Sequence, residues 1–228
     1  MRKAVEIDNL NYRYKGQEKD TLHHINFHLN QGEIVGIRGP SGGGKSTLCY
    51  VMKGIIPYMI GGNMTGSVNI LEQSMADRTP QERVALIGMV FQEPHSQLFS
   101  STVEDELAFP LENLCVPQRE MKKRVNEVLG ELGLEKYRMQ HPSYLSGGEQ
   151  QLVALGSVLV LEPAILLLDE AMAHIDHASK MRLNEILRKR SDKGMSMMMV
   201  DHQEENLAIT DRVMHLIDGT LYDKEIRT

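Results

Sequence analysis

Residues 39–46 read Gly-Pro-Ser-Gly-Gly-Gly-Lys-Ser, and this motif constrains the fold more than any other part of the chain. It follows a short apolar run, Ile34 to Ile37, and precedes a segment with helical spacing, Ser46 to Gly54. Glycines let backbone N–H groups turn inward around an anion, where side chains would clash. A helix start adds unpaired N–H groups and a partial positive charge. The motif in this setting predicts a phosphate-binding loop.

A nucleotide site needs more than this loop. Lys45 supplies a positive charge for the outer phosphates, and the Ser46 hydroxyl can bind Mg²⁺. The second half is expected where a buried strand ends in acidic residues, and Asp169 and Glu170 directly follow the apolar run 165–168. Asp169 would hold the hydration shell of Mg²⁺ and Glu170 would polarise an attacking water. A glycine-rich turn and a solvated Asp-Glu loop are the alternatives.

Strand-like and helical segments alternate along the chain. The alternation of apolar and polar residues over 5–10 and 25–29 predicts half-buried antiparallel strands. Apolar runs predict further strands at 34–37, 66–70, 86–91, 165–168, 195–200 and 213–217. Helices are expected over about 46–54, 148–161 and 178–190. Continuous apolar strands that alternate with helices predict a parallel sheet covered on both faces.

The middle of the chain has a different, mostly helical character. Segments 104–114 and 120–132 have helical spacing, and four prolines, at 94, 110, 117 and 142, are expected to punctuate the helices. We therefore expect a helical subdomain at 93–154. The nucleotide-binding core with its β subdomain would comprise 1–92 and 155–228.

Composition and the lengths of the apolar runs argue against some classes of function. A net charge of −6 gives no electrostatic reason to expect a nucleic-acid partner. No apolar run approaches the roughly 20 residues that span a bilayer, and no apolar stretch follows the basic residues at the start, so we expect neither a transmembrane segment nor a signal peptide. Cys49 and Cys115 lack metal-type spacing and favour a reducing, cytoplasmic setting.

A third motif, Leu-Ser-Gly-Gly-Glu-Gln at 145–150, stands directly before a predicted helix. Together with the phosphate loop and the Asp169-Glu170 strand, in this order, it resembles the ATPase subunits of ABC transporters over nearly the whole chain. The resemblance implies the ABC ATPase fold. This is an α/β P-loop NTPase (RecA-like) core with an N-terminal antiparallel β subdomain and an inserted helical subdomain.

The resemblance also implies roles for individual residues. Tyr14 matches an aromatic residue that stacks on adenine, and His202 matches a histidine that contacts the γ-phosphate. The residues assigned to catalysis are Glu170, His202 and Gln92, and those assigned to Mg²⁺ are Ser46, Gln92 and Asp169. The residues assigned to ATP binding are Tyr14, Gly39, Pro40, Ser41, Gly42, Gly43, Gly44, Lys45, Ser46, Thr47, Ser146, Gly147, Gly148 and Asp176.

In that family two ATPase domains pair head to tail, and each signature segment, Ser146 to Gly148 here, covers ATP on the phosphate loop of the other. A helix N-terminus that offers N–H groups to an anion is the physical basis. The implied cofactors are ATP and Mg²⁺. The implied partners are a second ATPase domain, identical or different, and a transmembrane coupling subunit, with the chain peripheral to the cytoplasmic face of the membrane.

One subfamily is most similar. Residues 91–100 read Phe-Gln-Glu-Pro-His-Ser-Gln-Leu-Phe-Ser and are followed by Thr-Val-Glu-Asp-Glu at 102–106. This resembles the ATPases of energy-coupling factor (ECF) importers of vitamins and of cobalt or nickel. In those importers the segment docks a coupling helix of the transmembrane subunit. Leu98 and Phe99 fit such a docking surface, or they belong to the core.

Several positions depart from the family pattern. Glu149 stands where glutamine is usual, Leu152 where a basic residue is common, and residues 171–174 replace Pro-Thr-Ala-Gly. Glu149 would face the nucleotide of the partner domain and add negative charge there. The cost in interaction free energy would be on the order of a kcal/mol at a partly exposed site. We therefore predict a heterodimer, or one half of a two-domain protein, with unequal sites.

Other functions remain open at this point. A non-transport ABC ATPase and a nucleotide-dependent dimerisation module with little turnover both fit the motifs, whereas a small-molecule kinase leaves the signature segment unexplained. His174 and His177 suggest a metal site. We prefer the interpretation that this segment is a loop followed by an Asp-capped helix. The methionines at 195–199 suggest soft-metal binding, which a buried strand explains better.

Overall fold

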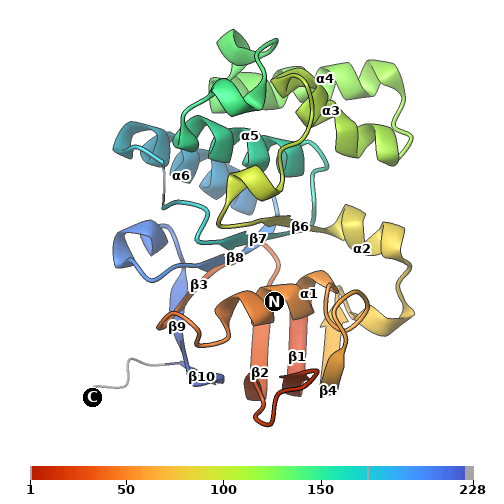
Figure 1. Ribbon diagram of the computed structural model, residues 1–228, viewed down its shortest axis with the longest axis vertical. Helices are drawn as coiled ribbons and strands as arrows, with labels where there is room; N and C mark the ends of the chain where they lie inside the picture. The colour runs from red at the N-terminus through yellow and green to blue at the C-terminus, as the bar shows by residue number, and fades with distance from the viewer. Residues whose placement is uncertain (1, 174, 224–228) are drawn as a thin grey trace. The chain divides into compact units, whose positions relative to one another are not determined.

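Figure 1 shows the computed structural model, which describes residues 2–173 and 175–223. The chain clusters into two compact units: 1–89, 164–170 and 190–228 form the first, and 90–163 and 171–189 form the second. The division differs from the expected one. The boundary expected at 92/93 lies at 89/90, and residues 155–163 cluster with the helical unit because helix α5 packs on α3 and α4.

An antiparallel sheet occupies the N-terminal part of the first unit (Figure 1). Its strands are β1 (Lys3–Tyr14), β2 (Leu22–Asn30), β4 (Gly62–Ile70) and β5 (Gln73–Ser74), in the order β2-β1-β4-β5. Ile7 of β1 pairs with Phe27 of β2 on one side and Val68 of β4 on the other, and all three side chains are buried. The antiparallel strands predicted from alternation are confirmed.

The second sheet follows the order β10-β9-β3-β8-β7-β6. Its strands are β3 (Ile34–Arg38), β6 (Ile87–Val90), β7 (Ile165–Asp169), β8 (Ser196–Val200), β9 (Arg212–Ile217) and β10 (Thr220–Tyr222). Strands β3, β7, β8 and β9 are parallel, and β10 runs antiparallel to β9. The parallel sheet is therefore confirmed, and the methionines of β8 are buried strand residues as preferred above.

The register of this sheet brings three loops to one edge. Ile37 at the end of β3 and Asp169 at the end of β7 both pair with Val200 at the end of β8. The phosphate loop, Glu170 and His202 each begin within two residues of these three positions. Since parallel strands place their carboxyl ends together, residues more than a hundred positions apart meet at this edge. Helix α1 (Lys45–Lys53) begins there.

Several short elements were not predicted, among them β5, β10 and helix α2 (Pro80–Leu86). Helix α2 begins with a capping box in which the Thr79 hydroxyl accepts from Glu82 N and the Glu82 carboxylate accepts from Thr79 N. Thr-Pro-Gln-Glu at 79–82 is a sequence signal for such a start. It was missed because the helix has no buried face, so its apolar periodicity is weak.

The second unit is helical, with α3 (Val103–Asn113), α4 (Gln118–Leu132), α5 (Gly147–Leu159) and α6 (His177–Asp192). Its 3-10 turns are Pro94–Ser96, Glu135–Tyr137 and Pro142–Tyr144. The helix expected over 104–114 is confirmed as α3, and Pro110 lies inside it rather than at a boundary. Within the described residues, no helix has the length and apolar content that a membrane span requires.

Candidate nucleotide site

The glycines of the phosphate loop have different physical roles. A Cβ on Gly39 would lie 2.0 Å from the carbonyl oxygen of Leu216, so strand β9 leaves no space there. Gly42 has a φ of +77° and faces open space, and Gly44 has a φ of +99° at the N-cap of α1. The loop therefore has left-handed turns and an open face beside Gly42, which suits an anion held by backbone N–H groups.

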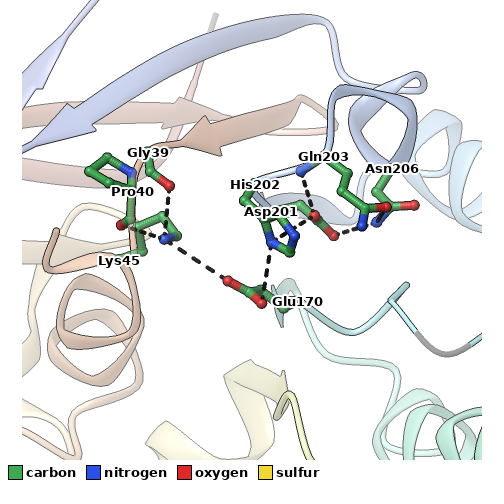
Figure 2. Close-up of polar contacts among 8 residues, drawn as sticks. All are labelled: Gly39, Pro40, Lys45, Glu170, Asp201, His202, Gln203 and Asn206. Carbon is green, nitrogen blue, oxygen red and sulfur yellow. Dashed lines mark hydrogen bonds and ion pairs between the residues drawn. The ribbon is translucent and has the colours of Figure 1, made fainter. Parts of the chain in front are cut away.

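Lys45 is the charged centre of this loop. Its side chain is only 6% exposed, and Nζ donates to the carbonyl oxygens of Gly39 at 3.0 Å and Pro40 at 2.9 Å (Figure 2). Nζ also lies 3.9 Å from Oε1 of Glu170. A buried ammonium group is costly unless anions and hydrogen-bond acceptors surround it. The site thus presents a preplaced cation at the base of the loop.

Two oxygen donors lie side by side at the start of α1 and the end of β7. Asp169 is 5% exposed, and burial raises the pKa of its carboxyl group. A hydrogen bond from Ser46 opposes that shift, whereas the neighbouring charge of Glu170 adds to it. A hydroxyl and a carboxylate are the kind of oxygen ligands that Mg²⁺ takes from proteins. The Ser46 hydroxyl and the Asp169 carboxylate therefore fit the Mg²⁺ ion that the sequence suggested.

Glu170 adopts an unusual backbone conformation, with a φ of +50°. Its N–H donates to the carbonyl oxygen of Val200 at 2.8 Å, which ties it to the end of β8. Its Oε2 lies 3.5 Å from Nδ1 of His202, while Oε1 faces Lys45 (Figure 2). Left-handed backbone in a non-glycine residue costs roughly 1–2 kcal/mol and is typical of functional positions.

A buried carboxylate orients the turn that carries His202. Asp201 is 2% exposed and accepts hydrogen bonds from Gln203 N and from Asn206 Nδ2, both at 2.8 Å (Figure 2). The first bond closes an Asx turn, which fixes the backbone on both sides of His202. The sequence analysis did not assign roles to Asp201 and Asn206. An aspartate directly after a buried strand is a signal for an Asx turn and could have indicated the role of Asp201.

Tyr14 reaches the same loop from the antiparallel sheet. Its hydroxyl lies 3.0 Å from Oγ1 of Thr47, and its ring packs edge-on against Tyr12 with centroids 4.9 Å apart. A second feature missed from the sequence is a cleft of about 370 Å³ beside the loop. Its lining residues are Arg38, Gly39, Pro40, His202, His215 and Ile217.

The remaining predicted site residues belong to the second unit. Gln92 follows β6, where the preceding backbone at Phe91 is held by two side chains: Gln97 Oε1 accepts from Phe91 N at 2.9 Å, and Gln151 Nε2 donates to Phe91 O at 3.2 Å. Asp176 accepts from Ala178 N at 3.0 Å and Ser179 N at 3.1 Å, so the predicted Asp-capped helix is confirmed. His174 lies outside the described residues.

The signature segment begins helix α5. Ser146 is the N-cap, and Gly147 and Gly148 form the first turn. The Glu149 carboxylate accepts from Ser146 N and Oγ, both at 2.8 Å, in a capping box. The charge expected near a phosphate is therefore bonded to Ser146. In the described part of the chain, no group of three or more histidine, cysteine, aspartate or glutamate side chains could hold a metal ion.

A strand, a phosphate loop and a helix, with acidic residues at the end of a parallel strand two positions away in the same sheet, define a P-loop nucleotide-binding protein of the α/β class. Comparison with known proteins narrows this class. The family described as ABC transporter matches residues 22–173. The chain belongs to this family, as its motifs implied, and is an ABC ATPase subunit.

Curated relatives extend over most of the chain. The ECF transporter ATP-binding protein EcfA1 of Levilactobacillus brevis is 33% identical over 97% of this chain and 78% of its own length. EcfA of Methanosarcina acetivorans is 35% identical over 95% of this chain and 77% of its own length. In a longer relative from M. acetivorans, 36% identical over 96% of this chain, the match spans only 34% of that protein. The expected relationship to ECF ATPases is confirmed.

Solved structures share the fold. CbiO1 of Clostridium perfringens, described as part of the ABC transporter complex cbiONQ, superimposes with a TM-score of 0.85 at 28% identity over 97% of this chain and 87% of that one. The dimeric bacterial ABC transporter cassette MJ0796 superimposes with a TM-score of 0.84 at 26% identity, over 97% of this chain and 100% of that one. The ABC ATPase fold, with its antiparallel β subdomain and helical subdomain, is confirmed. This fold binds ATP, and family membership implies ATP hydrolysis.

Proposed function

We propose that this chain is the Mg²⁺-dependent ATPase subunit of an ECF-type importer of a vitamin or of cobalt or nickel. The observation that carries the proposal is the placement of Glu170 between Lys45 and His202, at the edge where the phosphate loop begins. The ECF ATPases among its relatives and the likeness to CbiO1 support the importer class.

Binding would use the parts of the first unit that the sheet edge assembles. The loop from Gly39 to Thr47 would hold the phosphates through backbone N–H groups, with Lys45 as the charge that neutralises them. Tyr14, fixed by Thr47, would stack on the adenine. Ser46 and Asp169 would hold Mg²⁺, which spreads the charge of the outer phosphates when it is bound. Gln92, which follows β6, is the third residue that we propose as a Mg²⁺ ligand.

The reaction would depend on one carboxylate. Glu170 would accept a hydrogen bond from the attacking water and polarise it toward the γ-phosphate. His202, next to Glu170 and exposed to solvent on its other side, would contact the γ-phosphate. The Asx turn at Asp201 fixes the backbone that carries this histidine, which limits the reorganisation that the reaction requires.

Coupling to transport would need two further proteins. A second ATPase domain would bind head to tail, with Ser146 to Gly148 and Asp176 facing its nucleotide, and ATP would close the pair. A transmembrane subunit would hold the chain at the cytoplasmic face of the membrane. Phe99 is 64% exposed and stacks edge-on against Phe109 with centroids 4.6 Å apart, which favours a docking surface over a core position.

Affinity purification from the native cell, followed by phosphate-release assays, tests the proposal. We expect membrane proteins and a second ATPase domain to co-purify, and the complex to hydrolyse ATP. A Lys45→Ala complex should lose most of this activity. Purification with nucleic acid and without membrane proteins would instead favour a non-transport ABC ATPase. ATP-dependent dimerisation without phosphate release would favour a dimerisation module.

A further inference from the structure

The hydroxyl of the signature serine is engaged inside its own helical unit. Ser146 Oγ donates to Oε2 of Glu149 at 2.8 Å, and the N–H of Glu149 donates back to Ser146 Oγ at 3.4 Å. Because a hydroxyl has one proton, Ser146 cannot donate it to a phosphate while it donates it to Glu149. The position of the Glu149 carboxylate therefore controls what Ser146 presents to a ligand.

That carboxylate is held from its other side by Tyr137. The Tyr137 hydroxyl donates a hydrogen bond to Oε1 of Glu149, and the ammonium group of Lys136 lies 4.5 Å from the centroid of the Tyr137 ring. Tyr137 ends the 3-10 turn Glu135–Tyr137, which follows helix α4. A charge-assisted bond of this kind is among the stronger hydrogen bonds in proteins.

The surroundings leave the carboxylate room to move. A cavity of about 170 Å³ adjoins Tyr137 and Glu149, and the buried side chain of Leu152 lines it where the family often has a basic residue. Leu183 and Ile186 of α6 form part of its apolar wall. An unanchored Glu149 side chain can therefore take other rotamers, with its charge no longer directed at the N-terminus of α5.

We propose that Tyr137 is a positioning residue of the signature segment, which acts through Glu149 to set the direction of the Ser146 hydroxyl. The inference rests on the proposed function, in which Ser146 covers the nucleotide of the partner domain. With Glu149 anchored, its Oε2 also accepts from Ser146 N, a bond that does not depend on the Ser146 proton. When a phosphate approaches, the Ser146 proton can leave Glu149 and turn to the phosphate, while the anchored carboxylate keeps its bonds to Tyr137 and to Ser146 N.

A double-mutant cycle on the purified native complex tests this role. We expect Tyr137→Phe to raise the KM for ATP about tenfold, near the lower end for the loss of one charge-assisted hydrogen bond, with kcat changed less than about twofold. Glu149→Ala should raise KM by a similar factor, and the double variant should show no further increase, because Tyr137 acts only through Glu149. Glu149→Gln should keep a KM near that of wild type, since glutamine also forms a capping box.

Tyr222→Phe, on β10 in the other unit, serves as the matched control and should leave KM unchanged. Urea unfolding of each variant separates positioning from stability: a structural role alone would lower the unfolding midpoint without moving KM. Additive effects on KM, or an unchanged KM in Tyr137→Phe, would overturn this inference alone. A wild-type complex without Lys45-dependent ATP hydrolysis would overturn the proposed function, and the inference with it.

Discussion

Oε2 of Glu170 lies 3.5 Å from Nδ1 of His202, and the other oxygen of the same carboxylate lies 3.9 Å from Nζ of Lys45. One side chain thus joins the phosphate loop to the strand end that carries the histidine. Glu170 is 13% exposed, so these contacts occur where water screens charges poorly. A residue in this position can influence both the resting state of the site and its chemistry.

Replacement of Glu170 by glutamine separates these two contributions. Glu170→Gln keeps the size of the side chain and removes the charge that polarises water, so we expect ATP turnover to fall at least about hundredfold. Nucleotide binding should persist, because the loop and Lys45 are unchanged. Phosphate release and equilibrium binding of a fluorescent ATP analogue measure the two quantities. Turnover near the wild-type rate would show that another group activates the water.

Two glycines of the phosphate loop should respond differently to alanine. In Gly39→Ala the new methyl group meets the Leu216 carbonyl, and we expect a loss of about 3 kcal/mol in unfolding free energy without nucleotide. Gly42→Ala has free space but a φ of +77°, so its loss should be roughly 1 kcal/mol.

The methyl group of Gly42→Ala would project into the open face of the loop, so ATP affinity should fall about tenfold. Urea unfolding and ATP titration of the same two proteins test this pair of expectations. Equal stability losses in both variants would contradict the roles assigned to the two glycines.

Asp169 illustrates a conflict between stability and function. Burial raises the pKa of its carboxyl group, which means that the charged form is unfavourable in the folded chain. Asp169→Asn removes that charge and can still accept the Ser46 hydrogen bond. We expect the variant to be about 1 kcal/mol more stable at neutral pH and to lose Mg²⁺-dependent turnover. A lower melting temperature than wild type would contradict this expectation.

The lowered pKa of Glu149 leads us to expect that the free energy of unfolding depends on pH. Its pKa is lowered, chiefly by the hydrogen bond from Tyr137. A carboxyl group with a lowered folded-state pKa stabilises the fold above its unfolded pKa, near 4.5, and this contribution is lost as the pH falls through the folded-state pKa. Tyr137→Phe removes the largest cause of the shift. The stability difference between wild type and Tyr137→Phe should therefore be constant above about pH 6 and shrink below about pH 4.5.

Urea unfolding across this pH range measures the difference. For Tyr222→Phe we expect a difference from wild type that does not vary with pH, because Glu149 keeps its partner. A Tyr137→Phe difference that grows on acidification would show that the sign of the linkage is wrong.

Much of the fold was predictable because local patterns report local structure. Alternation over 5–10 and 25–29 predicted β1 and β2, and the apolar runs predicted β3, β7, β8 and β9 within a few residues. Helix α2 was missed because no face of it is buried, whereas the helix predicted over 104–114 formed as α3 with Pro110 inside it. The unit to which α5 belongs depended on its packing against α3 and α4, which spacing does not encode.

The sequence by itself determined which chemistry the chain carries. Glycine spacing, Lys45, the Asp169-Glu170 pair and the signature segment are local patterns, and each has a physical reason to be contiguous. Only the tertiary structure decided which distant groups meet. The parallel register brings Glu170 between Lys45 and His202, and the turn after α4 brings the Tyr137 hydroxyl to the Glu149 carboxylate. The Ser-x-x-Glu spacing at 146–149 is itself a local capping-box signal, whereas the contact of Tyr137 with Glu149 depends on how the turn after α4 packs against the start of α5.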